Sequence, residues 1–304
     1  MDLQQLLLPS PLGDLPDLSA LRAMSPQVAF LFGPEAPLRD GTWLRRLAAA
    51  LPGTLLLGCS AAGVIGGEGV EDTAAVLTAV RFREARIRAV AQPLARMEDS
   101  FATGQALARQ LQEEDLKGAL VLAPGLHING TRLLEGLQAI LGVDFPLSGG
   151  LAGDDARFQA TWTLLDGSPD PQRVVALGFY GPSVVLGSAS MGGWEPFGPI
   201  RKITDAHENV LRSLDGEPAL EVYRRYLGEW AKDLPASALL FPLALYRNDL
   251  SDTCIVRTIL GIDEATGSLI LAGNAPKQGF VRLMHASTNA LVEGARRAAE
   301  GLPE

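Results

Sequence analysis

Residues 54–63, Thr-Leu-Leu-Leu-Gly-Cys-Ser-Ala-Ala-Gly, decide the fold predicted for this chain. A short apolar run, which predicts a buried strand, ends here in a loop of glycine and other small residues. A similar stretch returns at 145–153, Phe-Pro-Leu-Ser-Gly-Gly-Leu-Ala-Gly. Two strands that each end in such a loop indicate two copies of one structural unit.

The sequence around these stretches repeats in the same order. A shift of about 90 positions superposes Gly41-Thr42 on Gly130-Thr131, and each pair opens a predicted helix. We therefore predict an internal duplication with pseudo-twofold symmetry, with repeats over 27–95 and 118–190. A strand at 184–189 is predicted to close the second repeat.

The chain changes character after residue 190, where predicted strands outnumber helices. This pattern predicts an α+β fold, with mixed β-sheets and packed helices, rather than a doubly wound parallel sheet. We expect an N-terminal extension over 1–24, a first domain over 25–215 and a second domain over 216–304.

Composition excludes several functional classes. The net charge is −9 and no basic block is present, so nucleic-acid binding is not expected. Every apolar run is interrupted before it reaches the length of a membrane span, and no Lys or Arg precedes the first one as in a secretory leader. The two cysteines, Cys59 and Cys254, suit a reducing compartment, and we expect a cytoplasmic protein.

The two small-residue loops are candidate binding elements. Glycines let a backbone approach a ligand and offer N–H groups to an anion, although tight packing of layers also demands small residues. An arginine in an apolar strand needs a partner or an exposed face, and it can fork onto a carboxylate. The candidate ligand-binding residues are Gly58, Cys59, Ser60, Gly63, Gly149, Gly150, Gly153, Asp154 and Arg257.

Two other chemistries remain as alternatives. Cys59 or Ser60 could act as the nucleophile of a hydrolase, but a small cysteine at a strand end is more often buried, so an enzyme is not our main expectation. The three histidines form no spaced pair typical of a metal site. A single histidine can hold haem iron, which makes His285, or else His207, a candidate axial ligand.

Several motifs together resemble one known family. The loops at 58–63 and 148–154 resemble the N-terminal FIST domain, as does Leu214-Asp215-Gly216-Glu217-Pro218 at its end, and 256–263 with 279–284 are similar to the C-terminal FIST domain. The resemblance implies a sensory module that binds small ligands such as amino acids, and some FIST proteins bind haem and sense nitric oxide. It also implies a separate signalling partner, such as a kinase or cyclase.

Overall fold

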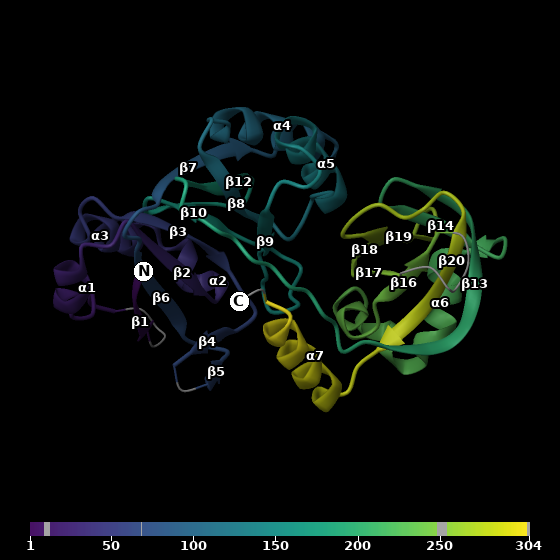
Figure 1. Cartoon of the computed structure of the whole chain (residues 1–304). Coiled ribbons are helices and arrows are strands. Elements are labelled where there is room, and N and C mark those ends of the chain that lie inside the picture. Colours follow the sequence, from purple (N-terminus) through teal and green to yellow (C-terminus); the bar gives the residue numbers. More distant parts are fainter. Residues whose placement is uncertain (9–12, 68, 248–253, 303–304) are drawn as a thin grey trace. The chain divides into compact units, whose positions relative to one another are not determined.

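A computed structural model describes residues 1–8, 13–67, 69–247 and 254–302 (Figure 1). The chain forms two compact units. The first contains Met1–Ile128 and Leu133–Leu186, and the second contains Asn129–Arg132 and Gly187–Glu304. Mixed sheets with packed helices confirm the predicted α+β class.

The first unit contains two main sheets (Figure 1). The six-stranded sheet has the order β1 (Asp2–Leu8), β6 (Ala75–Arg81), β2 (Val28–Gly33), β3 (Leu55–Ser60), β10 (Thr163–Leu165) and β11 (Ser168–Asp170). The four-stranded sheet has the order β7 (Arg86–Pro93), β12 (Arg173–Tyr180), β8 (Leu116–Ala123) and β9 (Leu147–Leu151). A small hairpin joins β4 (Val64–Gly66) to β5 (Gly69–Glu71). The helices are α1 (Ser19–Met24), α2 (Glu35–Arg39), α3 (Gly41–Ala50), α4 (Ser100–Leu111) and α5 (Gly130–Leu141), with a 3-10 turn η1 (Met97–Asp99). The first three residues of α5 belong to the second unit.

These elements form four layers: α1 with α3, the six-stranded sheet, the four-stranded sheet, and α4 with α5. A strand can face a core on each side because its successive residues point to opposite faces. In β3, Leu56 packs with α1 and α3 in one core, while its neighbour Leu57 packs in a second core between the two sheets. In β12, Val175 belongs to the core between the sheets, and Ala176 faces α4 and α5. Apolar strands that are buried on both faces follow from this arrangement.

The two sheets share a strand pattern. In each, a parallel pair, β2–β3 or β8–β9, is bordered by an antiparallel strand, β6 or β12, which pairs in turn with β1 or β7. This is the topology that a duplication would produce, and the duplication itself stays a prediction. The segment predicted as an N-terminal extension therefore contributes a sheet strand, β1.

The prediction of a strand at 184–189 is wrong. The structure has no strand there, and Val185 is almost fully exposed. The physical reason lies in the neighbouring strand β12, because both of its edges are already paired, with β7 on one side and β8 on the other. The strand at 86–93, which the prediction placed in the first repeat, takes the position that 184–189 would need.

The second unit is built on one antiparallel sheet (Figure 1). Its order is β17 (Ile255–Arg257), β16 (Leu243–Tyr246), β20 (Gly279–His285), β13 (Glu195–His207), β14 (Val210–Leu214), β19 (Ser268–Leu271) and β18 (Ile259–Asp263), with β15 (Glu217–Pro218) beside β14. Its helices are α6 (Ala219–Leu227) and α7 (Thr288–Glu300), with 3-10 helices η2 (Gly228–Asp233) and η3 (Ala236–Leu240). The apolar face of α6, with Leu220, Tyr223 and Leu227, packs into the core of this sheet.

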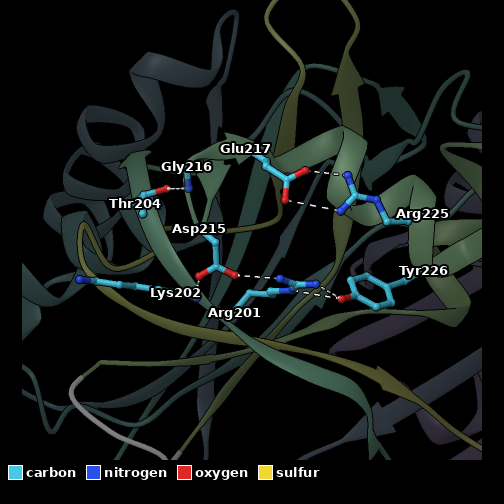
Figure 2. Close-up of polar contacts among 8 residues, drawn as sticks. All are labelled: Arg201, Lys202, Thr204, Asp215, Gly216, Glu217, Arg225 and Tyr226. Carbon is cyan, nitrogen blue, oxygen red and sulfur yellow. Dashed lines mark hydrogen bonds and ion pairs between the residues drawn. The ribbon is translucent and has the colours of Figure 1, made fainter.

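Three residues of the motif at 214–218, Asp215, Gly216 and Glu217, make polar contacts within the second unit (Figure 2). Asp215 and Gly216 adopt positive φ in the turn after β14, and the Asp215 carboxylate accepts from the Lys202 N–H at 2.9 Å and from Arg201 at 3.1 Å. Arg201 also donates to the Tyr226 hydroxyl, and Gly216 N–H donates to Thr204 Oγ1 at 3.0 Å. These contacts join β13 to the turn and to α6, so the motif links neighbouring elements of this unit.

The ion pair between Glu217 and Arg225 lies beside these contacts (Figure 2). Arg225 Nη2 lies 2.6 Å from Glu217 Oε2, and this hydrogen bond lowers the pKa of the carboxyl group. Every charged group of the motif thus has a partner.

In the described part of the chain, no helix has both the length and the apolar character needed to cross a bilayer.

Candidate functional site

Glycines within β3 and β9 allow close contact between parallel strands. A Cβ atom on Gly58 would overlap the main chain of Leu31 in β2, and one on Gly149 would overlap the main chain of Val121 in β8. Gly149 also has a φ of 146°, which side chains rarely adopt. Both positions require glycine for packing before any ligand is considered.

Cys59 and Ser60 are buried at the end of β3. Cys59 lies in the core between the two sheets, and burial raises the pKa of its thiol to about 12. Ser60 Oγ accepts a hydrogen bond from the Trp162 N–H at 3.0 Å. A thiol with such a pKa is protonated at neutral pH, which removes the nucleophilic thiolate that catalysis would need.

We expect Cys59 to resist alkylation in the folded protein. Iodoacetamide at pH 8 should modify Cys254, which is only partly buried, and leave Cys59 unmodified until denaturant is added, because the reagent attacks the thiolate. Peptide mass spectrometry before and after unfolding measures both sites in one sample. Rapid labelling of Cys59 under native conditions would instead reveal an accessible, activated thiol.

The two loops meet, and their amide groups are already used. The main-chain N–H groups of Ser60, Ala61, Ala152 and Gly153 donate at 2.8 Å to the carbonyl oxygens of Trp162, Gly33, Ala123 and Ser60, in that order. The bond from Gly153 to Ser60 joins the two loops directly. These four amides are therefore not available to an anion in this structure, which removes the contact that the sequence pattern suggested for them.

The other loop residues lie in different surroundings. The Asp154 carboxylate is buried and accepts from the N–H groups of Gln159 at 2.7 Å and Ala160 at 3.3 Å, so it shapes its own loop. A Cβ on Gly63 would lie 3.0 Å from the Asp72 carboxylate, whereas Gly150 is exposed and has no atom within 4 Å of the same position. Gly150 is the loop glycine with free space around it.

Arg257 belongs to the second unit, at the end of β17. Its half-buried guanidinium donates to Thr131 Oγ1 at 3.3 Å, to the Asn274 carbonyl oxygen at 3.4 Å and to the Val256 carbonyl oxygen at 3.5 Å. All three acceptors are neutral and all three distances are long. Burial lowers the pKa of this arginine, and within the described ranges no carboxylate forms an ion pair with it.

Asn274, which accepts from Arg257, belongs to a cluster of three asparagines. Asn129 Nδ2 donates to Asn274 Oδ1 at 2.7 Å and to Asn209 Oδ1 at 3.5 Å, and Asn209 Nδ2 donates to the Leu271 carbonyl oxygen at 2.9 Å. Asn129 and Asn209 are both buried. Thr131 Oγ1 also accepts from the Asn274 N–H at 3.0 Å. The arginine is thus held by a neutral polar framework that supplies no counter-charge.

Sequence reasoning named Arg257 as a candidate but not the residues around it, Asn129, Thr131, Asn209 and Asn274. Asn129-Gly130 and Gly273-Asn274 have the composition of ordinary turns, which hides their burial. The close fit appears only in space, where a Cβ on Gly273 would overlap Thr131 Oγ1. The sequence offers one signal, the apolar residue Ile128 directly before Asn129, and the structure shows that Ile128 is fully buried.

The histidines considered as haem ligands lie in the second unit. His285, in β20, is partly buried, and its ring contacts Phe197 edge-on at 5.8 Å between centroids. His207 is exposed at the end of β13. Across the described residues, no three His, Cys, Asp or Glu side chains come together as a metal site. The haem alternative stays a prediction.

Comparisons with known proteins give the following matches. The family model of the FIST N domain matches residues 27–217, and that of the FIST C domain matches residues 219–304. No curated protein matches this sequence. Among solved structures, the chain is similar to the crystal structure of cyanuric acid hydrolase from A. caulinodans, with 11% identity over 94% of this chain and 99% of that chain. The TM-score is 0.29, a value too low to support any argument.

Proposed function

Because this chain belongs to the FIST family, whose domains are associated with small-ligand sensing in signal transduction, we propose that it senses a small carboxylate, such as an amino acid, anchored by Arg257. The single observation that carries this proposal is a half-buried guanidinium whose described acceptors are all neutral. A buried charge without a counter-charge is costly, and a ligand that supplies the opposite charge removes this cost.

The geometry of Arg257 suits a carboxylate. Its contacts use one N–H group on each of the three guanidinium nitrogens. Since a guanidinium has five N–H groups, Nη1 and Nη2 each retain a second one. Two N–H groups on adjacent nitrogens form the fork that binds a carboxylate through both oxygens.

The neutral framework favours recognition over catalysis. Thr131 and the asparagines fix the guanidinium without neutralising it, so its positive charge remains available to a ligand. The candidate nucleophile Cys59 is a protonated core thiol in the first unit. We therefore favour a binding module over a thiol-dependent hydrolase.

A thermal titration tests this proposal. The full-length protein is heated with a panel of amino acids and small carboxylates, each beside its neutral amide or methyl ester. At about 100 times its dissociation constant, a specific ligand stabilises the native state by about 2.7 kcal/mol. For a domain of this size, we expect the melting temperature to rise by roughly 5–10 °C with a carboxylate and to stay unchanged with its neutral analogue.

Two results would contradict the proposal. One is a panel in which no carboxylate changes the melting temperature. The other is equal stabilisation by a carboxylate and its neutral amide, which would show that the charge is not recognised.

A further inference from the structure

The first unit contains a cavity that the proposed function does not use. It has a volume of about 230 Å³ and opens beyond the carboxyl end of β8, where the loop 124–129 leads into α5. Leu94, Leu126 and Pro171 supply apolar walls, and His127, Gln159 and Gln172 supply polar ones. In sheets with parallel strands, the space outside the carboxyl end of a strand is a frequent place for ligands.

The polar side chains of this cavity are free to bind. In the described part of the chain, the His127 imidazole and the Gln159 and Gln172 side-chain amides make no hydrogen bond or ion pair. Their backbones, by contrast, are fixed, since Gln159 N–H donates to Asp154 at 2.7 Å and the Gln172 carbonyl oxygen accepts from Leu94 N–H at 2.7 Å. These three exposed side chains thus have no protein partner among the described residues, and hydrogen bonds hold the backbone of Gln159 and Gln172 in place.

The loop that carries His127 is held in an uncommon conformation. His127 has a φ of 56°, which lies in the left-handed region of backbone conformation. Residues other than glycine adopt this region only at a cost in conformational energy. Its neighbours fix it there, because Ile128 is fully buried and Gly125 N–H donates to Thr161 Oγ1 at 2.8 Å on the cavity wall. The strained backbone places an exposed imidazole at the cavity.

The charge of the lining selects the class of ligand. Among the described residues that line the cavity, none is Asp, Glu, Lys or Arg. A charged ligand would lose hydration here without gaining a counter-ion, whereas an uncharged one with amide groups can use the imidazole and both glutamine amides. The volume lies below the roughly 300 Å³ of common small-molecule pockets, which limits the ligand to about one ring.

We propose that this cavity is a second binding site, separate from Arg257, for a small uncharged ring compound with an amide group. His127 and Gln172 hydrogen-bond the amide, and Leu94, Leu126 and Pro171 contact the ring. The site belongs to the first unit alone, so it does not depend on the proposed carboxylate site.

Nicotinamide is a suitable probe, and nicotinate is its charged counterpart of the same shape. We expect the full-length protein to bind nicotinamide with a dissociation constant of about 1 mM or tighter in ligand-observed NMR titrations. His127→Gly, which keeps the left-handed backbone accessible, and Gln172→Leu, which removes only the amide, should each weaken binding about tenfold. Nicotinate should bind at least about tenfold more weakly than nicotinamide to the unaltered protein.

The control is His207→Ala, which removes an exposed histidine from the second unit and should leave nicotinamide affinity unchanged. Circular dichroism melts show that each variant is folded at the titration temperature. The proposal is overturned if nicotinamide does not bind, if it binds both cavity variants as tightly as the unaltered protein, or if nicotinate binds equally well. Loss of nicotinamide binding in an Arg257→Met variant would also overturn it, since the ligand would then occupy the other site.

Discussion

Replacing Gly58 with alanine is expected to destabilise the protein by about 3 kcal/mol or more, the upper range for overpacking a rigid core. The new Cβ would overlap the main chain of Leu31, which pairs with Gly58 in the parallel strands β2 and β3. Neither strand has room to move, because Leu31 and Leu57 are both buried, on opposite faces of the sheet. A marginally stable unit would fail to fold with this substitution.

The matched control is Gly150→Ala, in the corresponding strand of the other sheet. A Cβ at Gly150 meets no atom within 4 Å, and its φ is not in the left-handed region, so we expect a change within about 0.5 kcal/mol. Urea unfolding followed by circular dichroism measures both variants. A Gly58→Ala protein with unaltered stability but reduced ligand affinity would show that Gly58 serves binding rather than packing.

Replacing Arg257 with methionine is expected to weaken carboxylate binding strongly while leaving the ligand-free protein at least as stable as before. The loss of a charge-assisted, forked contact should weaken affinity at least thirtyfold, equivalent to about 2 kcal/mol. The ligand-free protein loses a half-buried cation that no described carboxylate neutralises, and methionine retains most of the apolar stem. A gain in stability together with a loss of function is typical of a binding residue.

Arg282→Met is the control for this experiment. Arg282 lies in β20 of the same sheet and donates to the Gly198 carbonyl oxygen at 3.0 Å, so its replacement should leave ligand affinity unchanged. Denaturant melts with and without ligand give both quantities for each variant. If Arg257→Met instead lowers stability by several kcal/mol and spares affinity, Arg257 acts only to hold Thr131 and Asn274 in place.

The sequence by itself determined the fold class, many of the strands and helices, and the family. Strands β3 and β12 carry apolar residues on both faces, so each needs a core on either side. Such a pattern can be read from consecutive residues, because neighbouring side chains of a strand point to opposite faces. The turn at Asp215-Gly216 was equally readable, since positive φ selects such residues. The order of these motifs along the chain was sufficient to indicate the FIST domains, which the family models confirm.

Only the tertiary structure decided which of the candidate residues are free to act. The amides of Ser60 and Gly153 suggested an anion site, but the use of an N–H group depends on which carbonyl lies opposite, and both are bonded within the fold. The contact between Arg257 and Thr131 joins residues 126 positions apart, a distance over which no local pattern acts. His127 gave no motif at all, because a cavity is formed by segments brought together from four parts of the chain, and its lining exists only once the layers have packed.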